Sequence, residues 1–401
     1  MKFVLIVFCL FFTTKISAQR CAVSQTLPST SASRAYDGGT SSSEIKRDTL
    51  KDEVITIPVI IHVLYNNDQQ NISDQQILSQ IEVLNKDYRR QNTDAKNTPD
   101  VFKSVAADVK IVFCLASIDP KGNSTTGIIR KYTKENSFLA NDAMKFSATG
   151  GDEAWDATKY LNIWICNLSG NTLGYGLLPG SPAEIDGVVI KYTAFGTTGT
   201  ATSPYNKGRT ATHEIGHWLG LRHLWGDADC GDDGIADTPP QETSNSYCTV
   251  FPHLSSCSVN SYGDMFMNFM DFSDDACMNM FTQGQKNKMR SLFALGNSKN
   301  SFLNSAVCKS NTENAPLPGD TDTLLITAYP NPFVNEINIV CKSATGINGK
   351  VVKLYSITGS LYLSQVIQSA KTTLRVNNLP SGVYLLKIEG GEKPLIYKLV
   401  K

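Results

Sequence analysis

Three histidines and one glutamate fall within residues 213–223, which read HEIGHWLGLRH. Side chains four residues apart lie on the same face of a helix, so His213 and His217 can offer two imidazole nitrogens to one metal ion. Gly220 can take the left-handed conformation that ends a helix and turns the chain, which brings His223 back as a third ligand. Three protein ligands leave a fourth position for water, as in catalytic rather than structural zinc sites.

Glu214 adjoins the first histidine and is placed for acid-base chemistry. A carboxylate here can take a proton from a water molecule that attacks a carbonyl carbon and then give it to the leaving amine. A lone histidine is more often a core or capping residue. Five fixed positions match H-E-x-x-H-x-x-G-x-x-H, however, and three of the chain's 5 histidines lie in the match. The stretch therefore predicts a hydrolytic zinc site.

The chain that must position this site has 401 residues, which favours two domains with tails. Its 37 basic and 37 acidic residues balance, so a nucleic-acid-binding protein is not indicated. Residues 1–18 combine Lys2, an apolar run and a final Ala18, which predicts a secretory signal peptide. No later apolar run is long enough to span a membrane, so we expect a mature protein exported via the periplasm, either secreted or at the cell surface.

A flexible pro-segment is predicted over residues 19–47, which are rich in Ser, Thr and Gly, with Lys46-Arg47 as a processing point. Loss of Cys9 with the signal peptide reduces the 10 cysteines to nine, an odd number in an oxidising compartment. Cys21 could then fill the open zinc position as a latency switch, because a thiolate is a strong zinc ligand. The alternatives are an unpaired or mispaired thiol in a tail, or a metal capped by another group such as Asp37.

Residues 48–310 are expected to form the domain that holds the site. A β-branched run at 54–64 predicts a buried strand, and apolar residues at helical spacing predict a helix over 73–90 with Ser73 as its N-cap. Strand, helix and then several strands are typical of an α/β fold. His62 in the first strand is interpreted as a core residue and not as a fourth ligand. The later strands are expected at 109–116, 128–132, 161–167 and 188–192.

Loop composition replaces the periodic pattern after His223, over residues 226–262. Such a stretch cannot hold itself by core burial, so two disulfides would be needed among its cysteines and Cys277. Residues 229–238 (DCGDDGIADT) crowd oxygen ligands as calcium sites require, the alternative being a solvated acidic loop. His253 is interpreted as a surface residue.

Four cysteines have no pairing that follows from their positions. Cys114 and Cys166 lie in expected core strands and could pair or remain buried thiols, whereas Cys308 and Cys341 flank a linker without an obvious partner. That linker is predicted over 311–322 (NTENAPLPGDTD).

Residues 323–401 contain short alternating runs separated by turn signals at 329–333, 354–359 and 379–384. Regularly spaced turns of this kind predict a small antiparallel all-β sandwich as the C-terminal domain. These landmarks and the basic end resemble the sorting domain of proteins exported by the type IX secretion machinery, which the resemblance makes an expected partner. An accessory adhesion module is the alternative.

Two further motifs make a second resemblance specific: NFMDF at 268–272 and CMNMFTQGQ at 277–285. With the zinc motif they resemble the pappalysin branch of metzincins, the cytophagalysin or M43 peptidases, over residues 54–303. The resemblance implies a zincin (metzincin) α/β catalytic domain with an irregular lower subdomain, made as a secreted zinc endopeptidase. Protein or peptide substrates would lie extended along an exposed sheet edge. Independently of any family, Thr282 and Gln285 predict a capping box for a last helix.

The resemblance also assigns residues, with Met270 as the Met-turn residue beneath the three imidazoles. The chain departs from the family at Phe272, where a tyrosine hydroxyl would bind zinc or steady the tetrahedral intermediate. A surface binding protein on a zincin scaffold is the alternative function, favoured only by this phenylalanine, and a zinc amidase or esterase is a third. The resemblance further implies disulfides Cys230–Cys257 and Cys248–Cys277, and calcium near Asp233, Asp237 and Thr238.

Overall fold

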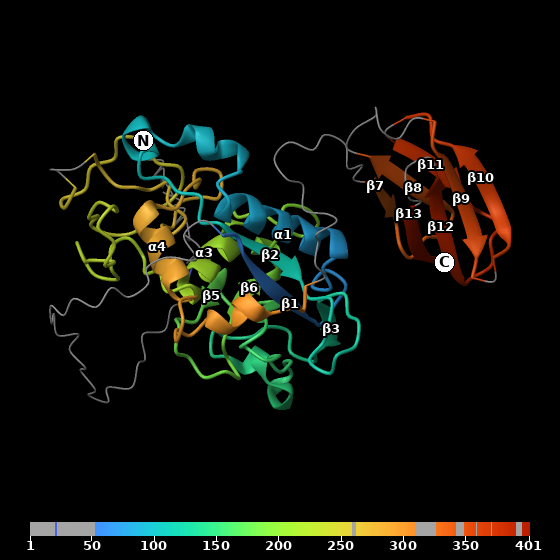
Figure 1. Cartoon of the computed structure of the whole chain (residues 1–401), viewed down its shortest axis with the longest axis horizontal. Coiled ribbons are helices and arrows are strands. Elements are labelled where there is room, and N and C mark those ends of the chain that lie inside the picture. The colour runs from blue at the N-terminus through green and yellow to red at the C-terminus, as the bar shows by residue number, and fades with distance from the viewer. Residues whose placement is uncertain are drawn as a thin grey trace, which may run out of the picture. The chain divides into compact units, whose positions relative to one another are not determined.

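The structure is a computed structural model that describes residue 21 and residues 53–258, 262–308, 326–341, 349–357, 359–369, 371–389 and 395–401. The chain divides into two compact units, Met1–Ser310 and Asn311–Lys401, which are treated separately (Figure 1). The expected signal peptide, the Lys46-Arg47 processing point, Asp37 and the linker lie outside the described residues.

A six-stranded sheet forms the centre of the first unit, in the order β2-β1-β4-β6-β5 with β3 also paired to β1. Every pair is parallel except β5 with β6. Five strands lie within a few residues of their expected positions, but the short edge strand β5 was not foreseen. The strands are β1 (Ile55–Tyr65), β2 (Ile111–Leu115), β3 (Ile128–Tyr132), β4 (Leu161–Cys166), β5 (Gly174–Gly176) and β6 (Val188–Lys191).

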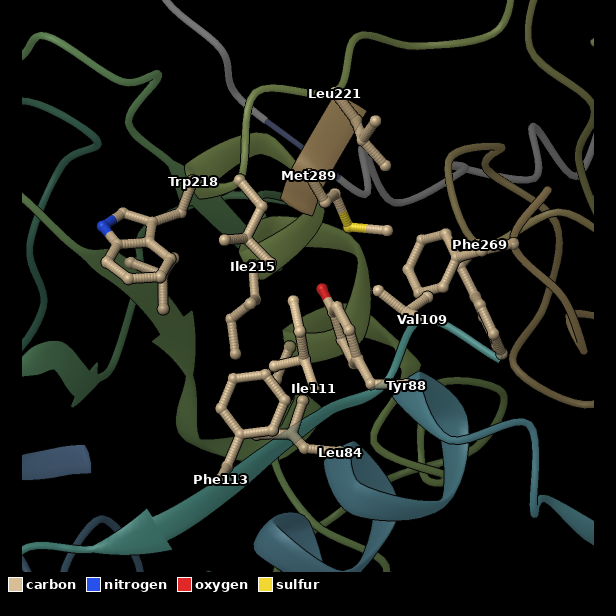
Figure 2. Packing of buried hydrophobic residues seen from close by; sticks show 14 of the residues in the cluster. Leu84, Tyr88, Val109, Ile111, Phe113, Ile215, Trp218, Leu221, Phe269 and Met289 are labelled. Atoms are coloured by element: carbon tan, nitrogen blue, oxygen red, sulfur yellow. The ribbon is translucent and has the colours of Figure 1, made fainter. Parts of the chain in front are cut away.

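Alternate residues of β1 point to opposite faces of the sheet. One set packs against helices α1 (Asp74–Tyr88) and α3 (Arg209–Trp218) in the main core cluster. Figure 2 shows side chains of α1, β2 and α3 meeting there, with Tyr88 between the two helices. The other set, including Ile60 and Leu64, belongs to smaller clusters. Both helices therefore lie on one face of the sheet, and that face carries the histidine motif.

Helix α1 begins where the sequence predicts, because the Ser73 side chain accepts a hydrogen bond from the Gln76 backbone N–H at 3.2 Å. It ends at Tyr88, two residues before the predicted boundary, since Arg90 takes a positive φ of 49°. The expected apolar stripe of this helix is buried against the sheet and α3.

His62 is fully buried, and its hydrogen-bond partners lie outside the histidine motif. Its Nδ1 lies 2.8 Å from the Asp152 carboxylate and its Nε2 lies 3.1 Å from the Asn162 side-chain oxygen. The ring also stacks on Trp164 at 5.1 Å between centroids. His62 is thus a hydrogen-bonded core residue, as interpreted from the sequence.

The chain between α3 and α4 (Gln283–Ser291) has no helix or strand among its described residues. This irregular lower part contains disulfides Cys230–Cys257 and Cys248–Cys277, the two pairs that the family resemblance implied. Helix α4 begins with the expected capping box of Thr282 and Gln285. The short helical segments of the unit are η1 (Thr93–Asn97), α2 (Asp100–Lys103), η2 (Ala143–Lys145), η3 (Ser147–Thr149), η4 (Tyr192–Ala194) and η5 (Asn300–Asn304).

A third disulfide joins Cys114 of β2 to Cys308, 194 residues away. Of the alternatives left open by the sequence, Cys114 and Cys166 do not pair with each other. Cys308 is the partner of Cys114, and Cys166 remains a buried thiol. The backbone N–H of Ser117 also donates to the Val307 carbonyl at 2.8 Å. In the chain-entropy model, closing a loop of this length stabilises the fold by about 5 kcal/mol.

The second unit consists of two antiparallel sheets, ordered β10-β9-β12-β13 and β11-β8-β7, around their own apolar cluster. The expected all-β C-terminal domain is confirmed. Across the described parts of both units, no helix is long and apolar enough to cross a membrane. The strands are β7 (Ile326–Tyr329), β8 (Glu336–Cys341), β9 (Val351–Ser356), β10 (Leu361–Val366), β11 (Lys371–Arg375), β12 (Val383–Glu389) and β13 (Leu395–Val400).

Strand β5 approaches α3 so closely that only glycine fits. A Cβ added at Gly176 would lie 2.2 Å from the backbone oxygen of Glu214, and one at Gly174 would lie 3.1 Å from the Glu214 Cγ. A strand with side chains on this face could not reach the same position. The two glycines therefore fix the edge of the sheet directly against the motif helix.

Gly176→Ala is expected to lower the melting temperature by roughly 3–10 °C, because overpacking costs about 1–3 kcal/mol. The added methyl group must push β5 away from the rigid α3 backbone. The matched control is Gly382→Ala, where a Cβ would meet no heavy atom within 4 Å. Calorimetry on both variants tests the contact, and equal melting temperatures would contradict it.

Candidate metal centre

The N-terminus of α3 is capped by a distant loop rather than by a neighbouring side chain. An Asp275 carboxylate oxygen accepts hydrogen bonds from the backbone N–H groups of Lys207 (2.8 Å) and Arg209 (3.2 Å). A carboxylate at this end of a helix satisfies N–H groups that have no intrahelical partner and interacts favourably with the helix dipole. The loop before α4 thereby fixes the start of the helix that carries the motif.

Buried charged groups hold the same helix against α1. The Arg209 guanidinium lies 3.1 Å from the Asp87 carboxylate and 3.1 Å from that of Asp94. Thr212 donates from its hydroxyl to Asp87 at 2.7 Å, and its own carbonyl accepts from the Tyr88 hydroxyl at 3.0 Å. Burial raises the pKa of Asp87 to about 7, while Arg209 acts in the opposite direction. Thr212 directly precedes His213, so these contacts position the first histidine.

The three imidazoles of the motif converge on one point. The Nε2 atom of His217 lies 3.1 Å from the Nε2 of His213 and 3.1 Å from that of His223. All three histidines are buried, at most 4% of each residue being exposed. Zinc bound tetrahedrally at about 2.0–2.1 Å from each nitrogen would separate its ligand nitrogens by about 3.3 Å. The spacing therefore fits three ligands of a single zinc ion.

The opposite ring nitrogen of each histidine donates a hydrogen bond, which fixes the tautomer. His213 Nδ1 donates to the Phe269 carbonyl at 2.7 Å and His217 Nδ1 donates to the Leu221 carbonyl at 2.9 Å. His223 Nδ1 donates to the Asp227 carboxylate. With the proton on Nδ1, each Nε2 directs a lone pair toward the shared point. Burial, followed by the nearby His223, also lowers the pKa of His217 to about 3, which keeps that ring neutral as metal binding requires.

A sharp turn after α3 returns the third histidine to the site. The helix ends at Trp218 and Gly220 takes a φ of +85°, as its position in the motif predicts. Beneath the helix, a Cβ on Gly216 would lie 2.4 Å from the sulfur of Met270, which is fully buried. The glycine inside the motif thus makes room for the methionine that the resemblance assigned to the Met-turn.

Asp271 organises the turn that carries Met270. Its carboxylate accepts the backbone N–H of Phe272 (2.7 Å), the backbone and side-chain N–H groups of Asn245 (both 2.8 Å) and the side-chain amide of Gln241 (3.1 Å). Burial raises the pKa of Asp271 to about 6, and these donors oppose that shift. Sequence reasoning missed Gln241 and Asn245, because they lie in a loop with no periodic pattern.

Phe272 supplies an aromatic ring to the site and no hydroxyl. Its centroid lies 4.9 Å from that of His223 and 5.7 Å from that of His213. Trp225 stacks on His223, parallel within 3° at 4.5 Å, and its ring also lies 5.0 Å from that of Phe272. The position that departs from the family pattern therefore forms part of an aromatic wall around the third histidine.

Cys21 lies at the centre of the site, where its thiol donates to the Glu214 carboxylate at 3.2 Å. Its sulfur and the three histidines form a group whose ligand atoms all lie within 4.8 Å of one another. Its backbone forms a parallel bridge with Gly174 of β5, and its side chain is 2% exposed. The structure thus brings Cys21, Glu214 and the three histidines together.

The suggested calcium residues do not all converge. The Thr238 hydroxyl donates to the Asp233 carboxylate at 2.9 Å, so these two are neighbours. Asp237 instead accepts from Thr282 at 2.6 Å and from the Gly284 N–H at 2.8 Å, at the start of α4. His253 is exposed and lies near Asp264. The sequence placed these residues in one loop but did not indicate that Asp237 binds the start of α4 instead of lying with Asp233 and Thr238.

Comparison with known proteins matches residues 147–294 to the M43 peptidase family model, described as pregnancy-associated plasma protein-A. Residues 327–401 match the secretion system C-terminal sorting domain. An extracellular metalloprotease of Arthroderma otae is 33% identical over 246 residues, which cover 59% of this chain and 76% of that protein. An extracellular metalloprotease of Podospora anserina is 29% identical over 250 residues, which cover 55% of this chain and 84% of that protein.

Solved structures of mirolysin are also similar to this chain. Mature mirolysin of Tannerella forsythia in complex with a cleaved peptide is 51% identical, with a TM-score of 0.61 over 63% of this chain and 96% of that one. A promirolysin mutant of the same organism is 51% identical, with a TM-score of 0.61 over 63% and 84%. The family implies a zinc cofactor and protein substrates, and the sorting domain implies export by the secretion machinery. The chain therefore belongs to the M43 peptidases and is a secreted metalloendopeptidase of the metzincin type.

Proposed function

We propose that this peptidase hydrolyses peptide bonds with zinc held by His213, His217 and His223 and with Glu214 as general base, and that it is made as a latent zymogen. The observation that carries the proposal is the convergence of three Nε2 atoms, with that of His217 lying 3.1 Å from each of the other two, beside a carboxylate that the Cys21 thiol contacts. The family supports both the metal and the reaction class.

Zinc, when bound, acts as a Lewis acid that polarises a carbonyl group and acidifies water. Glu214 takes a proton from the attacking water as its oxygen bonds to the carbonyl carbon. The carboxyl group then gives that proton to the leaving amine nitrogen as the C–N bond breaks. Full burial of the Glu214 side chain strengthens its interaction with the developing charges. The Phe272 side chain donates no hydrogen bond in this scheme, because it has no hydroxyl.

Glu214→Ala is expected to keep stoichiometric zinc and to lose roughly 10²–10⁴-fold in peptide hydrolysis, because proton transfer fails while the ligands remain. Metal analysis and hydrolysis of a peptide library by the processed protein measure the two quantities. Glu82→Ala, on the exposed side of α1, is the control and should retain full activity. Activity near that of the parent protein in Glu214→Ala would overturn the assigned mechanism.

Latency is supported by the position of Cys21 on the edge of β5. The sheet edge that an extended substrate would use is occupied at Gly174 by the backbone of Cys21. The sulfur belongs to the same group of potential ligand atoms as the three histidines, so as a fourth zinc ligand it would exclude water, and it contacts the Glu214 carboxylate. We propose that Cys21 blocks both the metal position and Glu214 until the pro-segment is removed.

Cys21→Ala should therefore shorten the lag before autoprocessing, which a time course of pro-segment cleavage measures. Cys166→Ala removes the other buried thiol and should leave the lag unchanged. Each variant is also prepared with Glu214→Ala, so that any cleavage in those samples comes from contaminating proteases alone. An unchanged lag in Cys21→Ala would mean that another pro-segment group, such as Asp37, caps the metal.

We further propose calcium for the loop at 229–238. Burial raises the pKa of Asp233 to about 6, with Asp232 and Asp237 adding to the shift. A bound cation would relieve this crowding of carboxylates, and Thr238 offers a further oxygen at 2.9 Å.

Removal of calcium with zinc resupplied should lower the melting temperature and expose the 229–238 loop to self-cleavage. Asp233→Asn should already melt at the lower temperature and should respond less to the chelator. Mass spectrometry of the fragments locates the cuts. If removal of calcium left the melting temperature of the parent protein unchanged, this result would argue against the calcium site.

A further inference from the structure

We propose that Asp227 is a positioning residue that orients His223 and sets the affinity of the site for its metal. The inference rests on the proposed assignment of His223 as a zinc ligand. It concerns a residue outside the H-E-x-x-H-x-x-G-x-x-H motif, four positions beyond the last histidine.

The three histidines differ in what accepts their Nδ1 proton. His213 and His217 donate to backbone carbonyls, which belong to the fold and carry no net charge. His223 donates to the carboxylate of Asp227, whose side chain is 24% exposed. A carboxylate raises the basicity of a coordinating imidazole more than a neutral carbonyl does. The third histidine is therefore the ligand whose electron donation depends on a single side chain.

The backbone after His223 reverses direction, so that the Asp227 carboxylate reaches the imidazole ring of His223. Gly226 donates its N–H to the His223 carbonyl at 2.9 Å and takes a φ of +57°, and Asp227 follows with a φ of +61°. A Cβ on Gly226 would lie 2.5 Å from the backbone of Asp232, so the turn requires glycine there. Two successive left-handed residues reverse the chain. Aspartate is one of the few residues with a side chain that tolerates this conformation.

The surrounding rings leave the imidazole one orientation. Trp225 stacks parallel to His223, and Phe272 lies perpendicular to both, at 4.9 Å from His223 and 5.0 Å from Trp225. Stacking fixes the plane of the ring, while the bond to Asp227 fixes its rotation within that plane. Phe272, which lacks the family's hydroxyl, thus takes part in holding the ligand.

Asp227→Asn is the test variant, because asparagine matches the shape of aspartate and also tolerates a left-handed backbone. It removes only the charge. Zinc affinity, measured on the protein by competition with a chromogenic chelator, should fall roughly 10–100-fold. Asp68→Asn, at an exposed position after β1 and outside both proposed metal sites, is the control and should leave the affinity unchanged.

The apoprotein separates positioning from a general structural role. Metal-free Asp227→Asn should melt at the same temperature as metal-free parent protein, while its zinc dissociation constant rises. Unchanged zinc affinity would overturn the proposal even if hydrolysis were impaired. A lower apoprotein melting temperature with unchanged affinity would show that Asp227 serves the loop alone. If Glu214→Ala failed to abolish hydrolysis, the proposed mechanism would fall, and the affinity result would still stand.

Discussion

Three imidazole lone pairs directed at one point are the constraint that the rest of the catalytic unit serves. Neutral nitrogens 3.1 Å apart, with no proton between them, repel one another until a cation is bound. The fold must therefore hold the rings in place without help from their mutual interaction. It does so through three fixed Nδ1 hydrogen bonds, a helix capped by Asp275, and Met270 packed beneath Gly216.

Local patterns in the sequence predicted the parts of this arrangement that depend on local geometry. Helical spacing placed His213 and His217 on one face, and hydrophobic runs located five of the six strands of the central sheet. Strand β5 left no such signal, because three residues with two glycines have no side-chain pattern. Its position depends on how closely the sheet edge can approach α3, which only tertiary structure reveals.

The remaining parts of the site are supplied by loops that are distant in sequence. Asp275 accepts backbone N–H groups at the start of α3, while Gln241 and Asn245 donate to the buried carboxylate of Asp271. The number of cysteines likewise could not show that Cys114 pairs with Cys308. It also could not distinguish the thiol of Cys166 from that of Cys21. Burial in an apolar cluster raises the pKa of the Cys166 thiol, whereas Cys21 lies beside three imidazoles. The surroundings of the two thiols, and not the number of cysteines in the chain, determine how their chemistry differs.

The bond between Cys114 and Cys308 also determines how the catalytic unit bears mechanical load. Residue 308 precedes the residues that lead to the sorting domain, so a force applied to that domain reaches the catalytic unit at Cys308. Traction arriving from that side passes through a covalent bond into β2 and then into the parallel ladder between β2 and β1. Residues between α4 and Cys308 are bypassed. Tension on the C-terminal end is therefore borne by the sheet and is not transmitted along the chain to the helix that carries the histidines.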